Sequence, residues 1–430
     1  MQIIENSKVK EKLYIEKLEN GLTVMIIPKK GIQKKYIIWG TNYGSNDNKF
    51  IVPGETEVTE VPKGVAHFLE HKMFEQENGK NSLDVLTALG VNANAYTTNN
   101  HTAYLYECTD NFYEALDEFM NYVQHPYFTD ENVEKEKGII AQEIKMYDDD
   151  PDWRVYFGAI ANLYHKHPVK IDIAGTCETV NNTYKDMLEL CYHTFYHPHN
   201  MMLFVVGNIQ PEELVDVIKE NQNKKHFLPE TSIQRKKIEE PESVAVKEQI
   251  DIMQVEMNKL IVSIKVNDIM TDPQEKIKRE LSFNLLFDLY FSKSSVLYNE
   301  WLSKGYINET FSANFTQERD YAFILIGGDQ DDYHLLQKTI FDFIEHIDDL
   351  VIEQEDFERI KRKTIGNFIN SYNSPESIAN SFSRYYFEGI CSFELVDYVS
   401  KITIADLNEV KKLRAKAWNT VSSLASFSWF

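Results

Sequence analysis

The sequence predicts an α+β protein made of two related domains, each an antiparallel-rich sheet with helices packed on it, joined by a linker. Three observations lead to this prediction. The chain has 430 residues, which is more than a single hydrophobic core usually serves. Short β-branched runs and longer helical patterns occur without the strict strand–helix alternation of a parallel sheet. The same order of strands, helices and a late strand occurs twice, which suggests an ancient duplication.

A change in composition separates the two predicted domains. Residues 223–245 are rich in Lys, Glu, Gln and Pro and contain few apolar side chains, as expected of an exposed linker. We therefore expect a first domain at residues 1–222 and a second domain at residues 246–430.

The elements of the first domain follow from apolar spacing and from turn residues. Residues 22–27 form a β-branched run that ends at Pro28, and residues 36–40 form another that ends in a cluster of Gly, Ser, Asn and Asp. Further strands are predicted at 94–98, 102–108 and 201–206, and helices at 64–75, 82–89, 111–123, 130–147 and 211–221.

The second domain is predicted by the same reasoning. Residues 275–290 place Ile277, Leu281, Leu285 and Leu289 on one helical stripe. Strands are predicted at 260–266, 323–326 and 421–430, and further helices at 333–347, 354–372 and 405–418.

Composition narrows the class of protein. The chain is 43% hydrophobic and 26% charged, with a formal net charge of −22, so we expect a soluble protein that binds neither nucleic acid nor a membrane. An acidic cavity would favour cationic peptides, although the charge could serve solubility alone. The charged start, residues 1–21, has no signal-peptide core, and the four cysteines form no metal or redox pair, so the expected compartment is the cytoplasm.

The most informative motif is His67-Phe68-Leu69-Glu70-His71. Four helical residues turn through about 400°, so His67 and His71 would project from one face and could reach one metal ion. Glu70 would lie close enough to take a proton from a metal-bound water. The order is the reverse of the common zinc-protease motif. The alternative is a solvated helix face with two ordinary histidines.

A catalytic zinc site needs a third protein ligand. The predicted helix at 130–147 offers Glu136 and Glu143, which are seven residues apart and so share a face. Spacing alone does not choose between them, and most charges on this helix could simply be exposed.

These residues carry a family resemblance. His67-x-x-Glu70-His71, followed by the run from Glu136 to Glu143, resembles the pitrilysin and insulysin clan of inverted-motif (inverzincin) zinc metallopeptidases. Its shorter branch includes the mitochondrial processing peptidase and bacterial processing proteases. Segments 90–97, 144–151 and 197–207 are also similar to that clan, while the second half matches only in length and layout.

The resemblance implies a site for one Zn²⁺ per chain. His67, His71 and Glu143 would bind the zinc ion, Glu70 would be the general base that activates its water, and Glu136 would be a supporting carboxylate. Substrate would add as a strand, held by main-chain hydrogen bonds, along Asn94, Ala95, Tyr96 and Thr97. The alternative for this segment is an ordinary strand end.

One expected pair is incomplete. Full-length members of the clan place an Arg and a Tyr seven residues apart in the half without zinc. Here Tyr306 is in register, but the Arg position holds Asn299, so Tyr306 could be only a packed aromatic. The absence suggests that a homologous, zinc-lacking subunit completes the site in a heterodimer, with a homodimer as the second possibility.

The resulting functional hypothesis is a cytoplasmic zinc endopeptidase that cuts short or unfolded peptides, or matures a small peptide precursor. One alternative is a peptide-binding subunit of a heterodimeric peptidase with little activity of its own. Another is a zinc lyase with the same inverted motif. Such lyases match this chain poorly, because they differ from it in length and use a cysteine as a zinc ligand.

Overall fold

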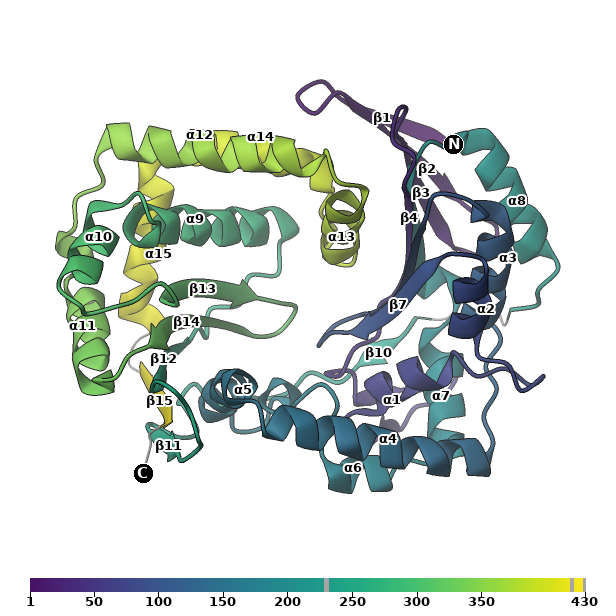
Figure 1. The fold of residues 1–430 in the computed structure, drawn as a ribbon, viewed down its shortest axis with the longest axis horizontal. Coiled ribbons are helices and arrows are strands. Elements are labelled where there is room, and N and C mark those ends of the chain that lie inside the picture. Colours follow the sequence, from purple (N-terminus) through teal and green to yellow (C-terminus); the bar gives the residue numbers. More distant parts are fainter. Residues whose placement is uncertain (228–231, 418–420, 428–430) are drawn as a thin grey trace.

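The computed structural model describes residues 1–227, 232–417 and 421–427. Figure 1 shows two halves, each with its own sheet and helices, that face each other and are bridged by α5 and the neighbouring segments. The predicted α+β class, with antiparallel-rich sheets in two related halves, is confirmed. No described helix has the length and apolar character needed to cross a membrane.

The first sheet has seven strands in the order β1-β2-β3-β9-β4-β8-β7. Every neighbouring pair is antiparallel except β3 and β9, which run parallel. The strands are β1 (Gln2–Asn6), β2 (Glu11–Lys17), β3 (Thr23–Pro28), β4 (Lys35–Thr41), β7 (Asn92–Thr97), β8 (Thr102–Cys108) and β9 (Met201–Gly207).

The second sheet has five strands in the order β11-β15-β12-β14-β13. They are β11 (Gln249–Asp251), β12 (Lys259–Lys265), β13 (Ser312–Gln317), β14 (Ala322–Asp329) and β15 (Val421–Phe427). A small third sheet joins β5 (Lys49–Ile51), β6 (Val58–Glu60) and β10 (Gln234–Arg235).

The two large sheets share one topology. Five strands of the first sheet and all five of the second can be numbered 1 to 5 in the order in which they occur along the chain. Their order across the sheet is then 1-5-2-4-3 in both cases, for β3-β9-β4-β8-β7 and for β11-β15-β12-β14-β13. In both, the first pair is parallel and the other three are antiparallel. An internal duplication would leave this pattern, although residue-level similarity between the halves is weak.

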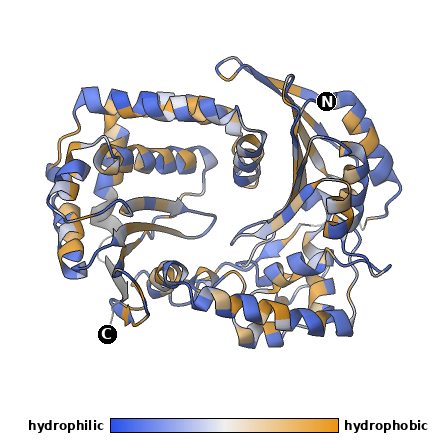
Figure 2. Cartoon of the chain, viewed as in Figure 1, coloured by the Kyte–Doolittle hydropathy of each residue, from blue (hydrophilic) through white to orange (hydrophobic). Residues whose placement is uncertain are grey.

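The helices of the first half pack mainly on one face of its sheet. They are α1 (Val65–Lys72), α2 (Ser82–Ala88), α3 (Phe112–Val123), α4 (Asp130–Asp148), α5 (Pro151–Leu163), α6 (Cys177–Asn181), α7 (Lys185–Phe195) and α8 (Pro211–Asn223). Those of the second half are α9 (Pro273–Phe291), α10 (Val296–Ser303), α11 (Tyr333–His346), α12 (Gln354–Ser371), α13 (Pro375–Tyr386), α14 (Leu395–Lys401) and α15 (Ile404–Ala417). Orange and blue residues alternate along the outer helices in Figure 2, as expected when one face is buried.

One helix from each half packs against the sheet of the other half. Helix α5 contacts β12 and β15, and α13 contacts β4 and β9. Phe382 of α13 stacks on Phe204 of β9 with ring centroids 4.7 Å apart. Because both faces of the central strands are covered, β4 and β9 are apolar on successive residues and do not alternate.

Several elements differ from the sequence-based prediction. The elements that were not predicted are helices α5, α6, α7, α10, α13 and α14 and strands β1, β2, β5, β6, β10, β11 and β13. The strand predicted at 323–326 continues through Gly327 and Gly328, and the helix predicted at 64–75 ends at Lys72. Parts of three predicted segments lie outside the described residues. They are residue 418 of the helix predicted at 405–418, residues 428–430 of the strand predicted at 421–430, and residues 228–231 of the predicted linker. The domain boundaries stay predictions.

Candidate metal centre

Helix α1 presents the two histidines because its other side is buried. Its apolar side enters the core through Val65, Ala66, Phe68 and Leu69. Gly64 directly precedes the helix with φ 89°, and a Cβ there would lie 2.3 Å from the carbonyl oxygen of Ala174. Only glycine allows this approach, so the entry to α1 is fixed against the segment before α6.

Helix α4 supplies the carboxylates. Its first turn is closed by a capping box between Thr129 and Asn132. Val133, Ile140 and Ile144 anchor it in the first core. The face that contacts α1 carries Glu136 and Glu143.

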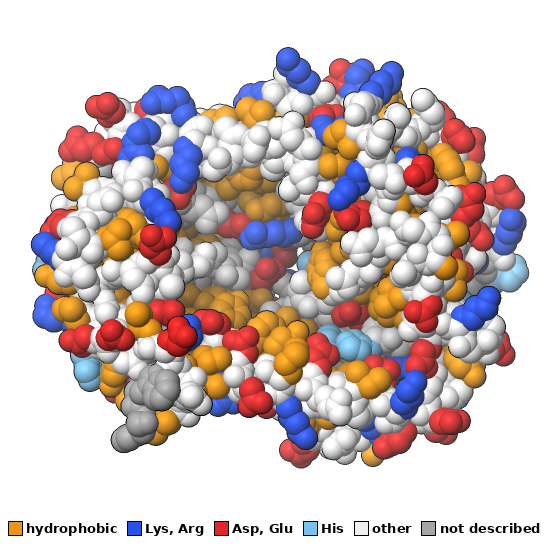
Figure 3. Space-filling model, viewed as in Figure 1, with side chains coloured by type: hydrophobic (Ala, Val, Ile, Leu, Met, Phe, Trp, Pro, Cys, Tyr) orange, Lys and Arg blue, Asp and Glu red, His pale blue; other side chains and the backbone are white. Residues whose placement is uncertain are grey.

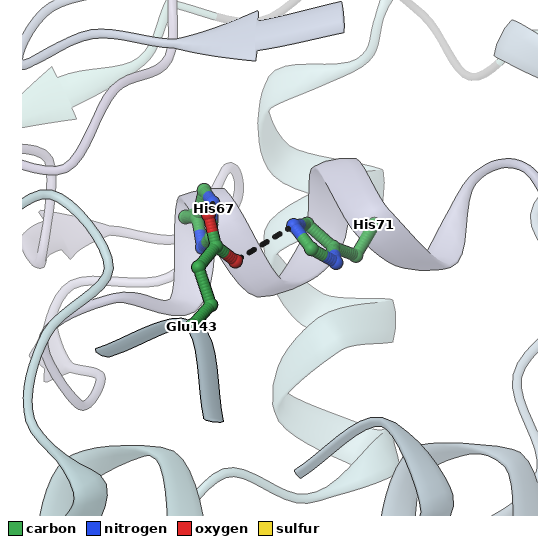
Figure 4. A group of neighbouring side chains, drawn as sticks. All are labelled: His67, His71 and Glu143. Carbon is green, nitrogen blue, oxygen red and sulfur yellow. Dashed lines mark ion pairs between the residues drawn. The ribbon is translucent and has the colours of Figure 1, made fainter. Parts of the chain in front are cut away.

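The three predicted ligands converge on one point. The His67 Nε2 atom lies 3.7 Å from Glu143 Oε1, and the His71 Nε2 atom lies 3.5 Å from Glu143 Oε2. Figure 4 shows Glu143 beside His67, with its carboxylate facing His71 across the dashed line, and both imidazoles carried by α1. Their ligand atoms all lie within 4.8 Å of one another, and among the described residues no other group of three His, Cys, Asp or Glu does so.

Glu136 takes a different position from Glu143. Its Oε1 atom lies 3.1 Å from His71 Nδ1, on the side of the ring away from Glu143. The ammonium of Lys72, which is fully buried, lies 3.7 Å from Glu136 Oε2 and 2.6 Å from Glu75 Oε2. Such a carboxylate fixes the orientation and tautomer of a ligand histidine.

The electrostatics of the two imidazoles differ. Burial, with a smaller contribution from neighbouring His71, lowers the pKa of His67 to about 3. Burial also lowers the pKa of His71, but the hydrogen bond to Glu136 and the charges of Glu70, Glu136 and Glu143 outweigh it and leave that pKa raised. His67 is therefore neutral at pH 7, which is the form that binds a metal ion.

Glu70 lies on the same helix and contacts the predicted substrate strand. Thr97 Oγ1 donates a hydrogen bond of 2.6 Å to Glu70 Oε2. Burial raises the pKa of Glu70 to about 6, and the bond from Thr97 opposes this shift. Glu70 is thus a nearly buried carboxylate held in one orientation.

Strand β7 is one of the two edge strands of the first sheet. Of the four predicted residues, Asn94 is exposed, and its side chain accepts a hydrogen bond of 2.9 Å from the N–H of Ala95. Tyr96 lies on the face of the strand opposite to Ala95 and Thr97 and packs beside His101, with ring centroids 5.7 Å apart. Among the described residues no strand pairs with the outer edge of β7.

The structure does not bring Tyr306 to this site within one chain. Tyr306 follows α10, which lies on the outer side of the second half in Figure 1, away from α1 and β7. Its ring packs against the second core and lies 5.7 Å from Lys304 Nζ. Asn299 donates hydrogen bonds to the carbonyls of Lys293 and Ser295, so it stabilises a local turn.

Sequence reasoning did not single out two further residues near the metal centre. One is Lys72, described above. The other is Tyr147, one helical turn beyond Glu143; burial and the Glu143 carboxylate raise its pKa. The Tyr147 ring stacks on Trp153 with centroids 4.3 Å apart. The i, i+4 spacing from Glu143 was the available signal for Tyr147.

The space between the halves is hollow. Figure 3 shows a depression there, with charged side chains of both signs and histidine at its margins. One cavity of about 310 Å³ begins at the end of β7 and is lined by Tyr96, Asn100 and His101 from the first half and by Arg384 and Phe387 from the second. The candidate peptide-binding edge therefore leads into a cavity between the halves.

Comparisons with known proteins agree with this geometry. The model of the insulinase family (peptidase family M16) matches residues 51–177, and the model of the M16 peptidase inactive domain matches residues 183–364. The protein named "Uncharacterized zinc protease YmfH" from Bacillus subtilis (strain 168) is 45% identical over 407 residues, which cover 95% of each chain. A second B. subtilis protein, "Uncharacterized zinc protease YmxG", is 31% identical over 40% of this chain and 42% of its own.

Solved structures extend the comparison to the whole fold. The crystal structure of an M16-like peptidase from Alicyclobacillus acidocaldarius is 33% identical, with a TM-score of 0.92 over 97% of this chain and 99% of that one. A protease from Helicobacter pylori has the same fold at 20% identity, with a TM-score of 0.82 over 97% of this chain and 100% of that one.

Proposed function

This chain belongs to the M16 family of peptidases, and from that premise we propose that it is a zinc-dependent endopeptidase. Its substrates would be short or unfolded peptides, or a small peptide precursor. The observation that supports this most directly is the convergence of His67, His71 and Glu143 beside the buried carboxylate of Glu70. Two imidazoles and one carboxylate form a donor set that suits zinc and leaves a fourth position open.

Each residue of the proposed zinc site would have its own role in peptide hydrolysis. His67, His71 and Glu143 would hold one zinc ion, and Glu136 would orient His71 through its Nδ1 atom. Bound zinc polarises a peptide carbonyl and lowers the pKa of water towards neutrality. Thr97 holds Oε2 of Glu70, so Oε1 is the oxygen that would take a proton from the attacking water and pass it to the leaving amine.

Substrate would bind by strand addition to the outer edge of β7, along Asn94, Ala95, Tyr96 and Thr97. The N–H of Ala95 is bonded to the side chain of Asn94, and a substrate carbonyl could replace that side chain. Main-chain hydrogen bonds tolerate many side chains, and this mode would select peptides by length and shape.

Two residues of the second half of the chain indicate that the active site needs a partner subunit. Asn299 occupies the expected arginine position, and Tyr306 lies away from the zinc site of its own chain. We infer that a second, homologous chain would complete the active site. A zinc-lacking homologue in a heterodimer is the leading assembly and a homodimer the second. The cytoplasm is the proposed compartment.

The test uses the purified full chain, alone and with a homologous partner, and a quenched peptide of roughly 10 to 30 residues. We expect cleavage that a chelator abolishes and that added zinc restores. Stoichiometric zinc with no cleavage of any peptide, with the partner present, would instead favour a peptide-binding subunit.

A further inference from the structure

Two hairpins that occupy equivalent positions in the two halves meet at their turns. Strands β7 and β8 are the third and fourth strands of the shared topology in the first half, and β13 and β14 are their equivalents in the second half. Both pairs are antiparallel and are closed by a turn of four residues. We call residues 98–101 the first turn and residues 318–321 the second turn. Figure 1 shows the ends of β7 and of the β13–β14 hairpin facing each other between the halves.

One side-chain hydrogen bond joins the two turns. Asn100 Nδ2 donates to Glu318 Oε2 at 2.6 Å, across 218 residues of sequence. Among the described residues Glu318 forms no ion pair, since the nearby cations Lys276 and Arg384 are bound by other carboxylates. The contact between the halves at this point therefore depends on one amide and one carboxylate.

The surroundings of Glu318 make this bond important to the turn. Burial and the charge of Glu388 raise the pKa of Glu318 to about 7, whereas two nearby cations and the bond from Asn100 oppose the shift. A hydrogen bond to a carboxylate contributes more in such a site than on the surface, because the local dielectric constant is low. Removing either partner would leave the other without its bond and would release the first turn.

The first turn is also held on another side, by the loop of residues 44–47. Two backbone N–H groups of this loop donate to carbonyls of the first turn, both at 3.0 Å. A Cβ on Gly44 would lie 2.4 Å from the backbone nitrogen of Asn100, so the loop lies directly against the turn. Arg319 of the second turn donates to Asp47 Oδ1 at 3.0 Å, and Asp47 Oδ2 accepts from the N–H of Gly44. The second turn thus holds the first turn directly, and also through this loop.

The second turn is itself fixed against the segment that follows α5. Tyr321 is buried, and its ring centroid lies 5.2 Å from that of His167. The Tyr164 hydroxyl donates to the carbonyl of Ala322 at 2.9 Å. Within the turn, the N–H of Glu318 donates to the carbonyl of Tyr321, also at 2.9 Å. These contacts give the Glu318 side chain a fixed support.

The first turn leads directly to the proposed base. Thr97 is the last residue of β7 and immediately precedes the turn. Its hydroxyl donates the bond of 2.6 Å to Glu70 Oε2. The N–H of Thr98 is bonded to the carbonyl of His101 at 2.8 Å, so the turn is closed and its residues move together. A displacement of the turn would therefore displace the Thr97 hydroxyl.

We propose that Glu318 is a positioning residue for peptide hydrolysis: it holds the first turn, and through it Thr97, so that Glu70 keeps its orientation. This role rests on the proposed function, because it presupposes that Glu70 is the base. It gives the second half of the chain a part in catalysis within its own chain, through a hairpin turn that does not reach the proposed zinc ligands.

The first experiment measures cleavage of the quenched peptide by the full-length protein, in the assembly that cleaves. Glu318→Ala should lower kcat at least roughly fivefold, with a change in KM below about twofold and unchanged zinc content. Glu318→Gln keeps an oxygen that accepts the bond from Asn100, so it should retain most of the activity. Asn100→Ala removes the same bond from the other side and should reproduce the loss, with no further loss in the double variant.

Asp320→Ala is the matched control. It removes a neighbouring carboxylate of the same turn, which lies 3.3 Å from Nε2 of His167. It should cleave the peptide as the parent does, and circular dichroism would establish that all variants are folded. An equal fall of kcat in Glu318→Ala and Asp320→Ala would overturn the proposal, because a general loosening of the contact between the halves would then explain both.

The path through Thr97 is tested in a second background. Thr97→Val lacks the hydroxyl that reaches Glu70, so adding Glu318→Ala to it should change kcat less than about twofold. Two effects that multiply independently in the double variant would show that Glu318 acts by another route and would overturn the proposal.

Amide hydrogen exchange tests the role without any cleavage. In zinc-free protein, the N–H groups of Thr97 and of the first turn should exchange at least roughly tenfold faster in Glu318→Ala than in the parent or in Asp320→Ala, because local opening costs less. Unchanged exchange would overturn the proposal. A parent that cleaves no peptide would refute the proposed function alone, and faster exchange at Thr97 would still support the positioning contact.

Discussion

Thr97 Oγ1 lies 2.6 Å from Glu70 Oε2 and donates a hydrogen bond to it. Thr97 ends β7, the strand proposed to hold substrate, and Glu70 is the proposed base. The sheet edge and α1, the helix proposed to bind zinc, are therefore joined at the point where the peptide bond would be cut.

Replacing Thr97 tests this connection. Thr97→Val removes the hydroxyl but keeps the shape, so Glu70 should lose its orientation. We expect kcat for a quenched peptide to fall roughly 10- to 100-fold, the effect of losing a hydrogen bond to a charged group. Thr97→Ser, which keeps the hydroxyl, should retain most activity, and zinc content should not change in either variant. Equal activity in Thr97→Val and the parent would refute the link.

The role of Glu70 is tested by Glu70→Gln. Removing a general base typically lowers the rate by roughly 10² to 10⁴-fold, and we expect a loss of that size. Zinc measured by elemental analysis should stay at one per chain, because Glu70 is not one of the three proposed ligands. Full activity in the Glu70→Gln variant would contradict the proposed mechanism.

The two carboxylates of α4 should respond differently to substitution. Glu143 faces both Nε2 atoms, while Glu136 contacts only Nδ1 of His71. Glu143→Gln should abolish measurable zinc retention, and Glu136→Gln should weaken it by roughly 10- to 100-fold, as expected of a carboxylate that orients a ligand. Competition with a chromogenic chelator measures both. Loss of zinc in Glu136→Gln alone would reverse the assignment.

Glu240 should make stability depend on pH. Burial opposes ionisation of this carboxylate, but Lys265 and three backbone N–H groups outweigh it and lower its pKa to about 2 from 4.5. A carboxylate with a depressed pKa in the folded state stabilises the fold above pH 4.5, and the contribution disappears as pH falls through about 2.

The variant Glu240→Gln should accordingly lower the free energy of unfolding by about 1–2 kcal/mol at pH 7, after discounting for partial solvent screening. The difference from the parent should shrink between pH 4.5 and pH 2. Urea unfolding at several pH values measures it. A difference that stays constant or grows as the pH falls would contradict the prediction.

Local patterns were sufficient to predict helix α1, with its two histidines on one face, and helix α4, with its two carboxylates. A few adjacent residues determine the apolar side of α1 and the i, i+4 spacing of its histidines. Along β7 and β8, residue types alternate as expected of paired strands. The choice between Glu136 and Glu143 depends on which one faces both imidazoles, and the spacing of the two residues does not contain that information. It came from the family resemblance; in the structure Glu143 is the carboxylate whose oxygens lie 3.7 and 3.5 Å from the two Nε2 atoms.

Elements that depend on the other half of the chain were missed. Helix α13 carries Ile378 and Phe382 towards a sheet more than 160 residues earlier in the sequence, and α5 begins at Pro151, directly after α4. No local pattern tells which sheet such a helix covers. Tyr306 was placed by register with a family pair, and its contacts within one chain do not test that role.

The reciprocal placement of α5 and α13 has a consequence for synthesis on the ribosome. The first sheet is complete once Gly207 has been made, yet the helix that covers its second face begins at Pro375, which is 375 − 207 = 168 residues later. At typical elongation rates this interval lasts roughly 10 to 30 s.

During that interval we expect Met25, Ile38 and Phe204 to be open to solvent and to chaperones. Nascent chains stalled at residue 370 should cross-link to a holdase through this sheet face, and complete released chains should not. The nascent first half would thus be a chaperone client until its partner helix emerges.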